Sequence, residues 1–319
     1  MPHVLVAGKI HDAGLNLFRN TPGVTVEVVE EVSTESYAPR ISEADALLIR
    51  TQPLPADVVA AARRLRIVSR HGVGYDAIDV PALEARGIAL AIVGDVNSRA
   101  VAEHTLALML ALTKRVTAYD AATRNGDWSI RNSFSATELW NKRLLVVGFG
   151  RIGRLVARMA DSFGMRVSAF DPFLSSAEIT QAHAEPVTSL EEALPAADIV
   201  SLHVPRAGSE ALIGDAQFKL MKRSAILINT SRGDLVDERS LATALDEEWI
   251  AGAGLDVFDA EPPPADNRLL QSERAVFTPH STALTNECAI RMSEAAAMNI
   301  LDFFEDRLDP RLLVVPKPY

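Results

Sequence analysis

Short apolar runs rich in β-branched residues alternate with helix-length segments along the whole chain. One series of expected strands fills the first third and a second series begins at residue 143. Continuous apolar strands separated by helices indicate parallel sheets covered on both faces, so the pattern predicts an α/β fold of two doubly wound domains. The expected strands are Val4–Ala7, Val24–Val29, Ala46–Ile49, Ile67–Ser69, Ile88–Ile92, Arg143–Val147, Arg166–Phe170, Ile199–Leu202, Ala225–Asn229, Gly254–Val257 and Ala275–Phe277.

Two long helix patterns accompany these strands. Gly94–Ser98 carries turn and cap residues, and we expect the boundary between the domains there. The helix that follows, roughly Arg99–Arg124, is apolar nearly all round, which predicts burial either between domains or between subunits. The last helix, about Thr285–Phe304, either closes the second domain or returns to the first, and its periodicity does not decide between them.

Composition and charge exclude several classes of protein. The 319 residues carry 32 basic and 42 acidic side chains, a net charge of −10, which argues against a nucleic acid or an anionic membrane as partner. Cys288 is the one cysteine, so an internal disulfide and a multi-thiolate metal cage are excluded. No secretory signal is visible, and the longest apolar tract, Leu106–Leu112, is too short to span a bilayer. We therefore expect a cytoplasmic protein without a metal.

A glycine-rich turn joins the strand that ends at Val147 to a helix. The sequence Gly148-Phe149-Gly150-Arg151-Ile152-Gly153 has the G-x-G-x-x-G spacing of a Rossmann dinucleotide-binding fold. Its first glycine allows the tight turn, its second lets a pyrophosphate approach the backbone, and its third lets the helix pack on the strand. The helix start then offers free N–H groups to the pyrophosphate. A tight turn without a ligand is the alternative.

An acidic residue at the end of the next strand favours the dinucleotide. Asp171 lies 18 residues after Gly153 (171 − 153), where a carboxylate would bond the adenosine ribose hydroxyls. Its charge would repel a 2′-phosphate, and the adjacent Pro172-Phe173 adds no cation. The sequence therefore predicts NAD rather than NADP as the cofactor.

An arginine, a glutamate and a histidine follow three successive strands of the second series. Arg232, Glu261 and His280 each lie a few residues beyond a strand end. The carboxyl ends of parallel strands line the ligand sites of doubly wound sheets, so these groups are expected together. Taken singly, each has a simpler interpretation: a surface arginine, a solvated loop acid and a helix cap. Their joint placement favours a catalytic set.

The order of these motifs resembles the D-isomer specific 2-hydroxyacid dehydrogenases, which include phosphoglycerate dehydrogenase and glyoxylate/hydroxypyruvate reductase. The resemblance covers nearly the whole chain and rests on Gly72–Asp76, Val101–Thr105, Gly148–Gly153, Ile228–Gly233, Gly254–Pro262 and Thr278–His280. It implies an NAD-dependent oxidoreductase of the EC 1.1.1 type, acting on a D-2-hydroxyacid/2-ketoacid pair. It also implies two Rossmann-like domains with a cleft between them: a substrate domain of 1–97 plus 290–319, and an NAD-binding domain of 98–289.

The same resemblance assigns roles to the catalytic set. His280 is implied to be the general acid in ketoacid reduction and the general base in the reverse direction, as an imidazole can be near neutral pH. Glu261 would hold the far ring nitrogen and favour the imidazolium. Arg232 would grip the substrate carboxylate and polarise the carbonyl.

The resemblance also implies two sets of binding residues. Those for the cofactor are Gly148, Gly150, Arg151, Ile152, Gly153, Asp171, His203, Val204, Pro205, Thr230, Ser231, Arg232, Asp256 and His280. Those for the substrate are Arg50, Thr51, the backbone of Val73 and Gly74, Arg232 and His280. His104 is expected near the nicotinamide or a subunit contact, without a catalytic role. Arg206 lies either near the cofactor phosphates or in solvent, and Ser281–Ala283 departs from the family's usual small pair.

The substrate and the partners are less closely defined. A short ketoacid such as glyoxylate or hydroxypyruvate is preferred over a 3-phosphoglycerate-type substrate, for which Arg50 and Arg70 are candidate cations. A formate dehydrogenase is disfavoured, since that branch has glutamine in place of Glu261. The alternative from another class is an NAD(H)-sensing, corepressor-like binding protein, which would show no turnover. The apolar helix after Asn97 suggests a homodimer, and the resemblance implies one, because members of the family usually form homodimers.

Overall fold

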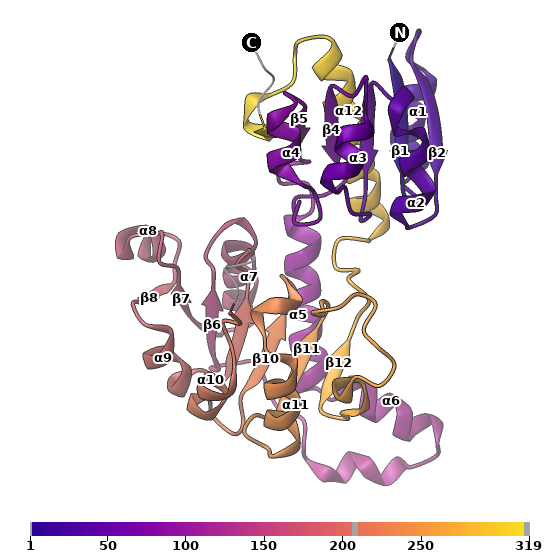
Figure 1. Ribbon diagram of the computed structural model, residues 1–319. Helices are drawn as coiled ribbons and strands as arrows, with labels where there is room; N and C mark the ends of the chain where they lie inside the picture. Colours follow the sequence, from indigo (N-terminus) through magenta and orange to yellow (C-terminus); the bar gives the residue numbers. More distant parts are fainter. Residues whose placement is uncertain (1, 206–209, 316–319) are drawn as a thin grey trace. The chain divides into compact units, whose positions relative to one another are not determined.

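The computed structural model describes residues 2–205 and 210–315, and the chain divides into two compact units. Unit 1 comprises Met1–Asn97 and Leu284–Tyr319, and unit 2 comprises Ser98–Ala283. Each unit has its own sheet flanked by helices (Figure 1). Arg206 lies outside the described residues. The predicted α/β class with parallel sheets is confirmed.

The sheet of unit 1 has the order β13-β5-β4-β3-β1-β2, and only β13 runs antiparallel to its neighbour. Its strands are β1 (His3–Ala7), β2 (Thr25–Val29), β3 (Ala46–Ile49), β4 (Ile67–Arg70), β5 (Ala89–Ala91) and β13 (Leu313–Val315). β3 is buried at every position, as expected of an apolar strand covered on both faces. Leu47 and Ile49 pack with Tyr37 and Val59 in one core cluster.

The helices of unit 1 form a layer on each face of this sheet. They are α1 (Asp12–Arg19), α2 (Thr34–Tyr37), α3 (Ala56–Ala61), α4 (Val80–Ala85) and α12 (Asn286–Phe304), with the 3₁₀ turns η1 (Ala38–Glu43) and η6 (Pro310–Leu312). The final helix, α12, packs beside α1 and across β3 and β4. The Ser69 hydroxyl of β4 donates to the Ala296 carbonyl of α12 at 2.9 Å. Its packing resolves what its periodicity left open, since α12 belongs with the first strands of the chain.

The sheet of unit 2 is entirely parallel in the described residues and has the order β12-β11-β10-β9-β6-β7-β8. Its strands are β6 (Arg143–Val147), β7 (Arg166–Phe170), β8 (Glu185–Val187), β9 (Ile199–Leu202), β10 (Ile226–Asn229), β11 (Gly252–Leu255) and β12 (Ala275–Phe277). β6 lies between β7 and β9, so the strand order reverses at β6. Ligands of such sheets bind beyond the carboxyl ends of the strands at this switch point.

Helices cover both faces of the unit 2 sheet. They are α5 (Ser98–Thr113), α7 (Arg151–Ser162), α8 (Ser176–Gln181), α9 (Leu190–Ala193), α10 (Asp215–Leu220) and α11 (Glu238–Asp246), with η3 (Leu194–Ala196), η4 (Gly233–Leu235) and η5 (Arg268–Gln271). α5 packs on α7 and on strands β10 to β12, while α10 and α11 pack together. Leu106 and Met109 of α5 belong to a core cluster with Val146 and Ile228 of the sheet.

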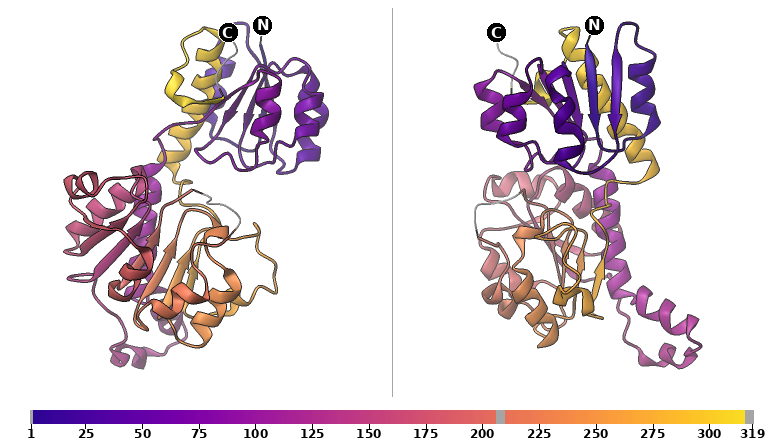
Figure 2. Two further views of the ribbon diagram at one scale, coloured as in Figure 1. Left: turned by 60° about the vertical axis from the view of Figure 1, so that its left-hand side comes forward. Right: turned by 45° about the vertical axis from the view of Figure 1, so that its right-hand side comes forward.

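The helix predicted over Arg99–Arg124 is two helices, which corrects the prediction. α5 ends at Thr113, Arg115 adopts a left-handed conformation with φ of 52°, and α6 (Val116–Arg124) begins after it. α5 is buried on the sheet of its own unit, so neither a domain contact nor a subunit contact is needed to explain its apolar faces. α6 buries no residue and, with η2 (Trp128–Ser133), belongs to an arm, residues 116–140, most of which stands away from the sheet (Figure 2). The arm returns to the core at Leu139, which packs with Leu144 and Val146 of β6.

Candidate active site

The glycine-rich turn lies at the switch point of the unit 2 sheet, between β6 and α7. Gly148 has φ of 89°, and a Cβ there would lie 2.6 Å from the His203 carbonyl oxygen. Gly153 packs directly on the Gly148 carbonyl, so any side chain would collide with the backbone. Gly150 caps α7, and a Cβ there would meet no described atom within 4 Å. The turn therefore leaves the first N–H groups of α7 open to an anion such as a pyrophosphate.

The acidic residue predicted to pair with this turn lies beside it. Asp171, at the end of β7, accepts the Phe149 N–H of the turn at 2.8 Å and the Phe173 N–H at 3.0 Å. An ionised carboxylate accepts about four hydrogen bonds, so two positions remain for ribose hydroxyls. The residues present thus fit an adenosine dinucleotide in both shape and charge.

His203 and Val204 complete this end of the sheet from β9. The His203 N–H donates to the Val147 carbonyl at 2.7 Å, and its Nε2 lies 2.8 Å from the Ser201 hydroxyl. Its Nδ1 is buried and has no partner among the described residues. Burial lowers the pKa of His203 to about 3, so its ring is neutral near pH 7 and cannot deliver a proton. The unpartnered nitrogen beside the glycine turn is a polar group for a ligand to bond.

The predicted acid–base pair is formed at the ends of β11 and β12. His280 Nδ1 lies 2.6 Å from Glu261 Oε2, and Glu261 Oε1 accepts the Phe258 N–H at 3.1 Å. A carboxylate only accepts, so the His280 proton belongs on Nδ1. The His280 side chain is 51% exposed, and its Nε2 has no partner among the described residues. The far nitrogen is therefore free to exchange a proton with a bound molecule.

Charge keeps the Glu261 carboxyl ionised. Burial alone would raise its pKa, but the hydrogen bond and charge of His280, the Phe258 N–H and the charge of Arg232 together lower it. Arg232 Nη1 donates to the Ser231 carbonyl at 2.7 Å, and Asn229 Nδ2 holds the Arg232 carbonyl at 2.7 Å. The structure thus brings Arg232, Glu261 and His280 into one electrostatic cluster.

The Arg232 turn and the Glu261 loop support each other directly. Gly233 packs against the backbone of Phe258 and Asp259, where no side chain would fit. Glu238, which the sequence analysis missed, accepts the Asp259 N–H and an Asn267 Nδ2–H, each at 2.7 Å, and so holds both ends of the Glu261 loop. An acid in the first turn of a helix is ordinary, so no sequence signal set Glu238 apart.

Three predicted cofactor residues have side chains engaged within the protein. Asp256 is fully buried and accepts bonds from the loop of His280. The Thr230 hydroxyl lies 3.0 Å from that of Thr105 on α5, and the Ser231 hydroxyl donates to the Leu202 carbonyl. These side chains hold loops in place, and their contact with a cofactor stays a prediction. Arg151 and Pro205 are exposed, and Ile152 is half-buried.

The predicted substrate residues of unit 1 lie at the carboxyl edge of its sheet. Arg50 follows β3 at the switch point beside β1, and its Nη1 donates to the Lys9 carbonyl at 3.2 Å. Burial lowers the pKa of the Arg50 guanidinium. Thr51 is exposed, and its N–H is held by the buried Gln52, a support that the sequence analysis missed. Val73 and Gly74 lie half-buried in the loop after β4.

The pKa of a buried histidine, His71, reflects the positive charge at this edge. Burial, and then the charges of Arg70 and Arg50, lower the pKa of His71 to about 3. His71 Nε2 lies 3.0 Å from the Ser293 hydroxyl of α12, which also accepts the His11 N–H at 2.9 Å. Two arginines thus lie near one neutral imidazole, an arrangement that favours an anion.

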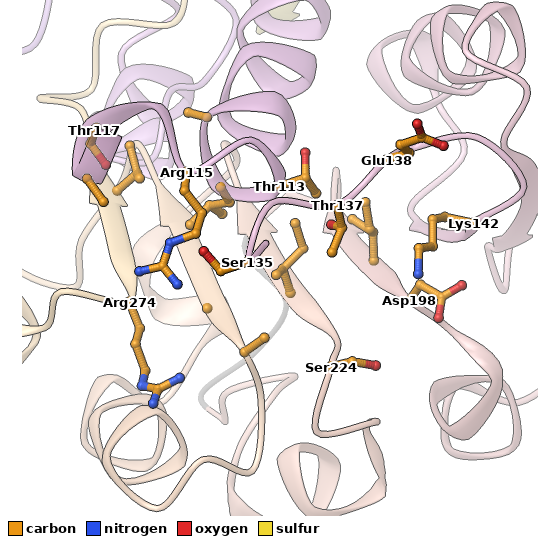
Figure 3. Close-up of a pocket in the computed structure, with 18 of the residues that line it drawn as sticks. Thr113, Arg115, Thr117, Ser135, Thr137, Glu138, Lys142, Asp198, Ser224 and Arg274 are labelled. Carbon is orange, nitrogen blue, oxygen red and sulfur yellow. The ribbon is translucent and has the colours of Figure 1, made fainter. Parts of the chain in front are cut away.

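A cavity of unit 2 lies at the other edge of its sheet. Figure 3 shows this cavity of about 380 Å³, with Arg115 and Ser135 on one side and Lys142 and Asp198 on the other. Its sheet residues lie just before or at the first positions of β9 to β12, so it lies at the amino ends of these strands. No predicted site residue lines it. Among the described residues, no group of three or more His, Cys, Asp or Glu is placed to hold a metal, and no helix is long and apolar enough to cross a membrane.

Comparison with known proteins connects this geometry to one family. The model of the D-isomer specific 2-hydroxyacid dehydrogenase NAD-binding domain matches residues 106–282. The glyoxylate reductase of Korarchaeum cryptofilum is 40% identical, over 98% of this chain and 96% of that protein. The D-3-phosphoglycerate dehydrogenase of Methanocaldococcus jannaschii is 35% identical over 99% of this chain, which spans 60% of that relative.

Solved structures agree with these relatives. The TT0316 protein of Thermus thermophilus has a TM-score of 0.89 and 35% identity, covering 98% of this chain and 100% of that one. The D-lactate dehydrogenase of Aquifex aeolicus, solved with NAD and lactic acid, has a TM-score of 0.89 and 26% identity, covering 99% and 100%. The matches confirm the predicted family and the NAD cofactor, and they do not favour the corepressor-like alternative. The chain belongs to the D-isomer specific 2-hydroxyacid dehydrogenase family and is an NAD-dependent oxidoreductase of that type.

Proposed function

We propose that the chain reduces a short 2-ketoacid of the glyoxylate or hydroxypyruvate type to its D-2-hydroxyacid, with His280 as the proton donor. The observation that carries this proposal is the 2.6 Å contact between His280 Nδ1 and Glu261 Oε2 on an exposed ring with an unpartnered Nε2. In this proposal unit 2 binds the cofactor, and unit 1 contributes Arg50, Thr51 and the Val73–Gly74 backbone to the substrate. Bound NADH supplies the hydride.

The residues of unit 2 divide the remaining chemistry between them. Glu261 stabilises the imidazolium of His280, and the Nε2 proton passes to the carbonyl oxygen as that oxygen gains charge. Arg232 binds the substrate carboxylate through its guanidinium and orients the carbonyl. In the reverse direction the neutral Nε2 removes the hydroxyl proton. Asp171 fixes the adenosine ribose and disfavours a 2′-phosphate.

A phosphorylated substrate of the 3-phosphoglycerate type is the second candidate. The observation that favours it is the placement of Arg50 and Arg70 around the neutral His71, because a doubly charged phosphate calls for more than one cation. The short ketoacid is preferred because it calls for fewer cations than a doubly charged phosphate, and because the glyoxylate reductase relative is 40% identical against 35% for the phosphoglycerate dehydrogenase.

Oxidation of NADH with three ketoacids tests both candidates. Glyoxylate, hydroxypyruvate and phosphohydroxypyruvate are compared by kcat/KM in the full-length protein and in Arg50→Gln and Arg70→Gln variants. The short-ketoacid proposal expects the largest kcat/KM with one of the first two, and a loss of less than about ten-fold in either variant. A dominant phosphohydroxypyruvate activity that collapses in both variants would select the second candidate. Absence of turnover with all three would overturn the proposed function.

We also propose that the arm, residues 116–140, joins two copies of the chain. Its exposed apolar side chains are Val116 (53%), Trp128 (68%), Phe134 (89%) and Trp140 (70%). α6 within this arm buries no residue of its own, and large exposed apolar side chains on such a segment mark a surface that a partner covers. Light scattering at micromolar concentration should give the mass of a dimer, and Trp128→Ser with Phe134→Ser should reduce it to a monomer. A monomeric mass of the unmodified chain would refute the dimer.

A further inference from the structure

Asp256 surrounds the backbone of His280 with hydrogen bonds. Its carbonyl accepts the His280 N–H at 2.8 Å, and its carboxylate accepts the N–H groups of Ser281 at 2.9 Å and Thr282 at 3.2 Å. Asp256 has no solvent exposure. The buried Asp256 side chain therefore holds the two residues that follow the predicted catalytic histidine. The backbone carbonyl of Asp256 holds the histidine itself.

The loop needs this support because His280 has an unfavourable backbone conformation. Its φ is 48°, in the left-handed region that residues with a Cβ avoid. Such a conformation persists only where surrounding contacts impose it. The same backbone geometry directs the imidazole at Glu261. A looser loop would therefore disturb the His280–Glu261 contact, although neither of those residues had changed.

A second hydrogen-bond chain reaches the same carboxylate from α5. The Thr278 hydroxyl donates to Asp256 Oδ1 at 2.5 Å, and His104 Nε2 lies 3.1 Å from that hydroxyl oxygen. A hydroxyl has one proton, and Thr278 gives it to Asp256, so the bond with His104 requires a proton on His104 Nε2. The chain thus has a fixed direction, from His104 through Thr278 to Asp256.

We propose that His104 is a positioning residue for His280, acting through Thr278 and Asp256. Its Nε2–H fixes the Thr278 hydroxyl in the orientation that donates to Asp256, which in turn holds the loop 278–282. Without that donor the hydroxyl is free to turn away, and the carboxylate loses one of its three donors. The inference rests on the proposed function of His280, but His104 itself touches no reacting atom in it.

Substitutions at His104 separate its N–H donor from its bulk. His104→Phe keeps a ring without a donor, and His104→Gln keeps an N–H that can reach Thr278. Glu103→Gln is the control, on an exposed neighbour that is paired with Arg99. We expect His104→Phe to lower kcat roughly five- to ten-fold and to move the pH profile of reduction. NADH affinity should stay within about two-fold, since the glycine turn is untouched. His104→Gln should regain most of the loss.

A double-mutant cycle with Thr278 tests the chain itself. Thr278→Val removes the hydroxyl and should lower kcat, whereas Thr278→Ser keeps it and should not. Because both residues act on Asp256 in series, His104→Phe should have no further effect in the Thr278→Val protein. Additive losses, or a His104→Phe enzyme with the kcat and pH profile of the unmodified protein, would overturn the inference. If His280→Ala is inactive but His104→Phe is fully active, the inference about His104 is overturned and the proposed function still stands.

Discussion

The two edges of the unit 2 sheet differ in how their charged groups are partnered. At the amino edge, the cavity of about 380 Å³ is lined by Lys142, Asp198 and Arg274. Lys222 lies 2.8 Å from Asp198, and Arg274 pairs with Glu248 at 2.5 Å. Asp198 and Arg274 are thus engaged in ion pairs, whereas Arg115 and Lys142 have no ion pair among the described residues.

At the carboxyl edge, the side chains are instead held in place by loops while their functional atoms stay open. His280 is fixed at Nδ1 but unpartnered at Nε2 among the described residues, and the first amides of α7 face open space beside Gly150. The difference teaches that a candidate site is recognised by groups that are held in place but still have hydrogen-bonding atoms free for a ligand, whereas a cavity alone does not identify one.

Removal of the imidazole should give the largest effect. His280→Ala is expected to lower kcat for ketoacid reduction at least about 1,000-fold, because it removes the proton donor of the proposed reaction. The dissociation constant of NADH, measured by fluorescence titration, should change little. The matched change at the amino edge, Arg115→Gln, should leave turnover unaltered. Comparable losses in both variants would end the distinction between the edges.

Removal of the carboxylate charge should have a smaller effect and a definite sign. The pKa of Glu261 is lowered, so its carboxylate keeps its charge until the pH falls below the usual range of a glutamate. Activity that depends on this charge should therefore be lost only in strongly acidic solution, as pH falls through the lowered pKa. Glu261→Gln should lower kcat roughly 100-fold and abolish that acidic loss, because an amide does not titrate there. A variant with the kcat and the acidic limb of the unmodified enzyme in steady-state assays would leave Glu261 a structural residue.

At the cofactor end of the same edge, charge should decide between NAD and NADP. Asp171→Asn keeps an acceptor for the Phe149 N–H but removes the negative charge that is proposed to face the ribose. We expect the ratio of kcat/KM for NAD to that for NADP to fall roughly ten-fold, chiefly through a lower KM for NADP. Parallel kinetics with both cofactors measure it. An unchanged ratio would mean that other residues exclude the 2′-phosphate.

Most of the fold was predictable because buried parallel strands are short continuous apolar runs. β3, β6, β7, β9 and β12 have the predicted bounds. β8 was missed because it is a short edge strand that contains Pro186, and proline is a signal against a strand. β13 was missed because its pairing with β5 joins residues more than two hundred positions apart. The break at Arg115 lies inside a helical pattern, with no glycine or proline to announce it.

The catalytic set was predictable for a different reason. The carboxyl ends of parallel strands share one edge, so Arg232, Glu261 and His280 could be brought together without coordinates. The supports of that set were not predictable in the same way. Glu238 and Thr278 act through side-chain hydrogen bonds between distant segments, and such bonds follow from side-chain geometry rather than from any periodicity. Asp256 could be placed at a strand end, but its burial beneath the His280 loop could not.

The smallest effect on activity is expected for a substitution at the amino edge of the unit 2 sheet. This substitution is the strictest test of the difference between the two edges. Arg274→Gln breaks only the exposed pair with Glu248, and such pairs contribute at most about 1 kcal/mol to folding. We expect kcat and KM within about two-fold of the unmodified enzyme and a small drop in Tm, read by calorimetry. A large loss of kcat with an unchanged Tm would show that the amino edge communicates with His280. In that case the free hydrogen-bonding atoms at the carboxyl edge would no longer be enough to define the active site, because a residue at the amino edge would also control the proton transfer.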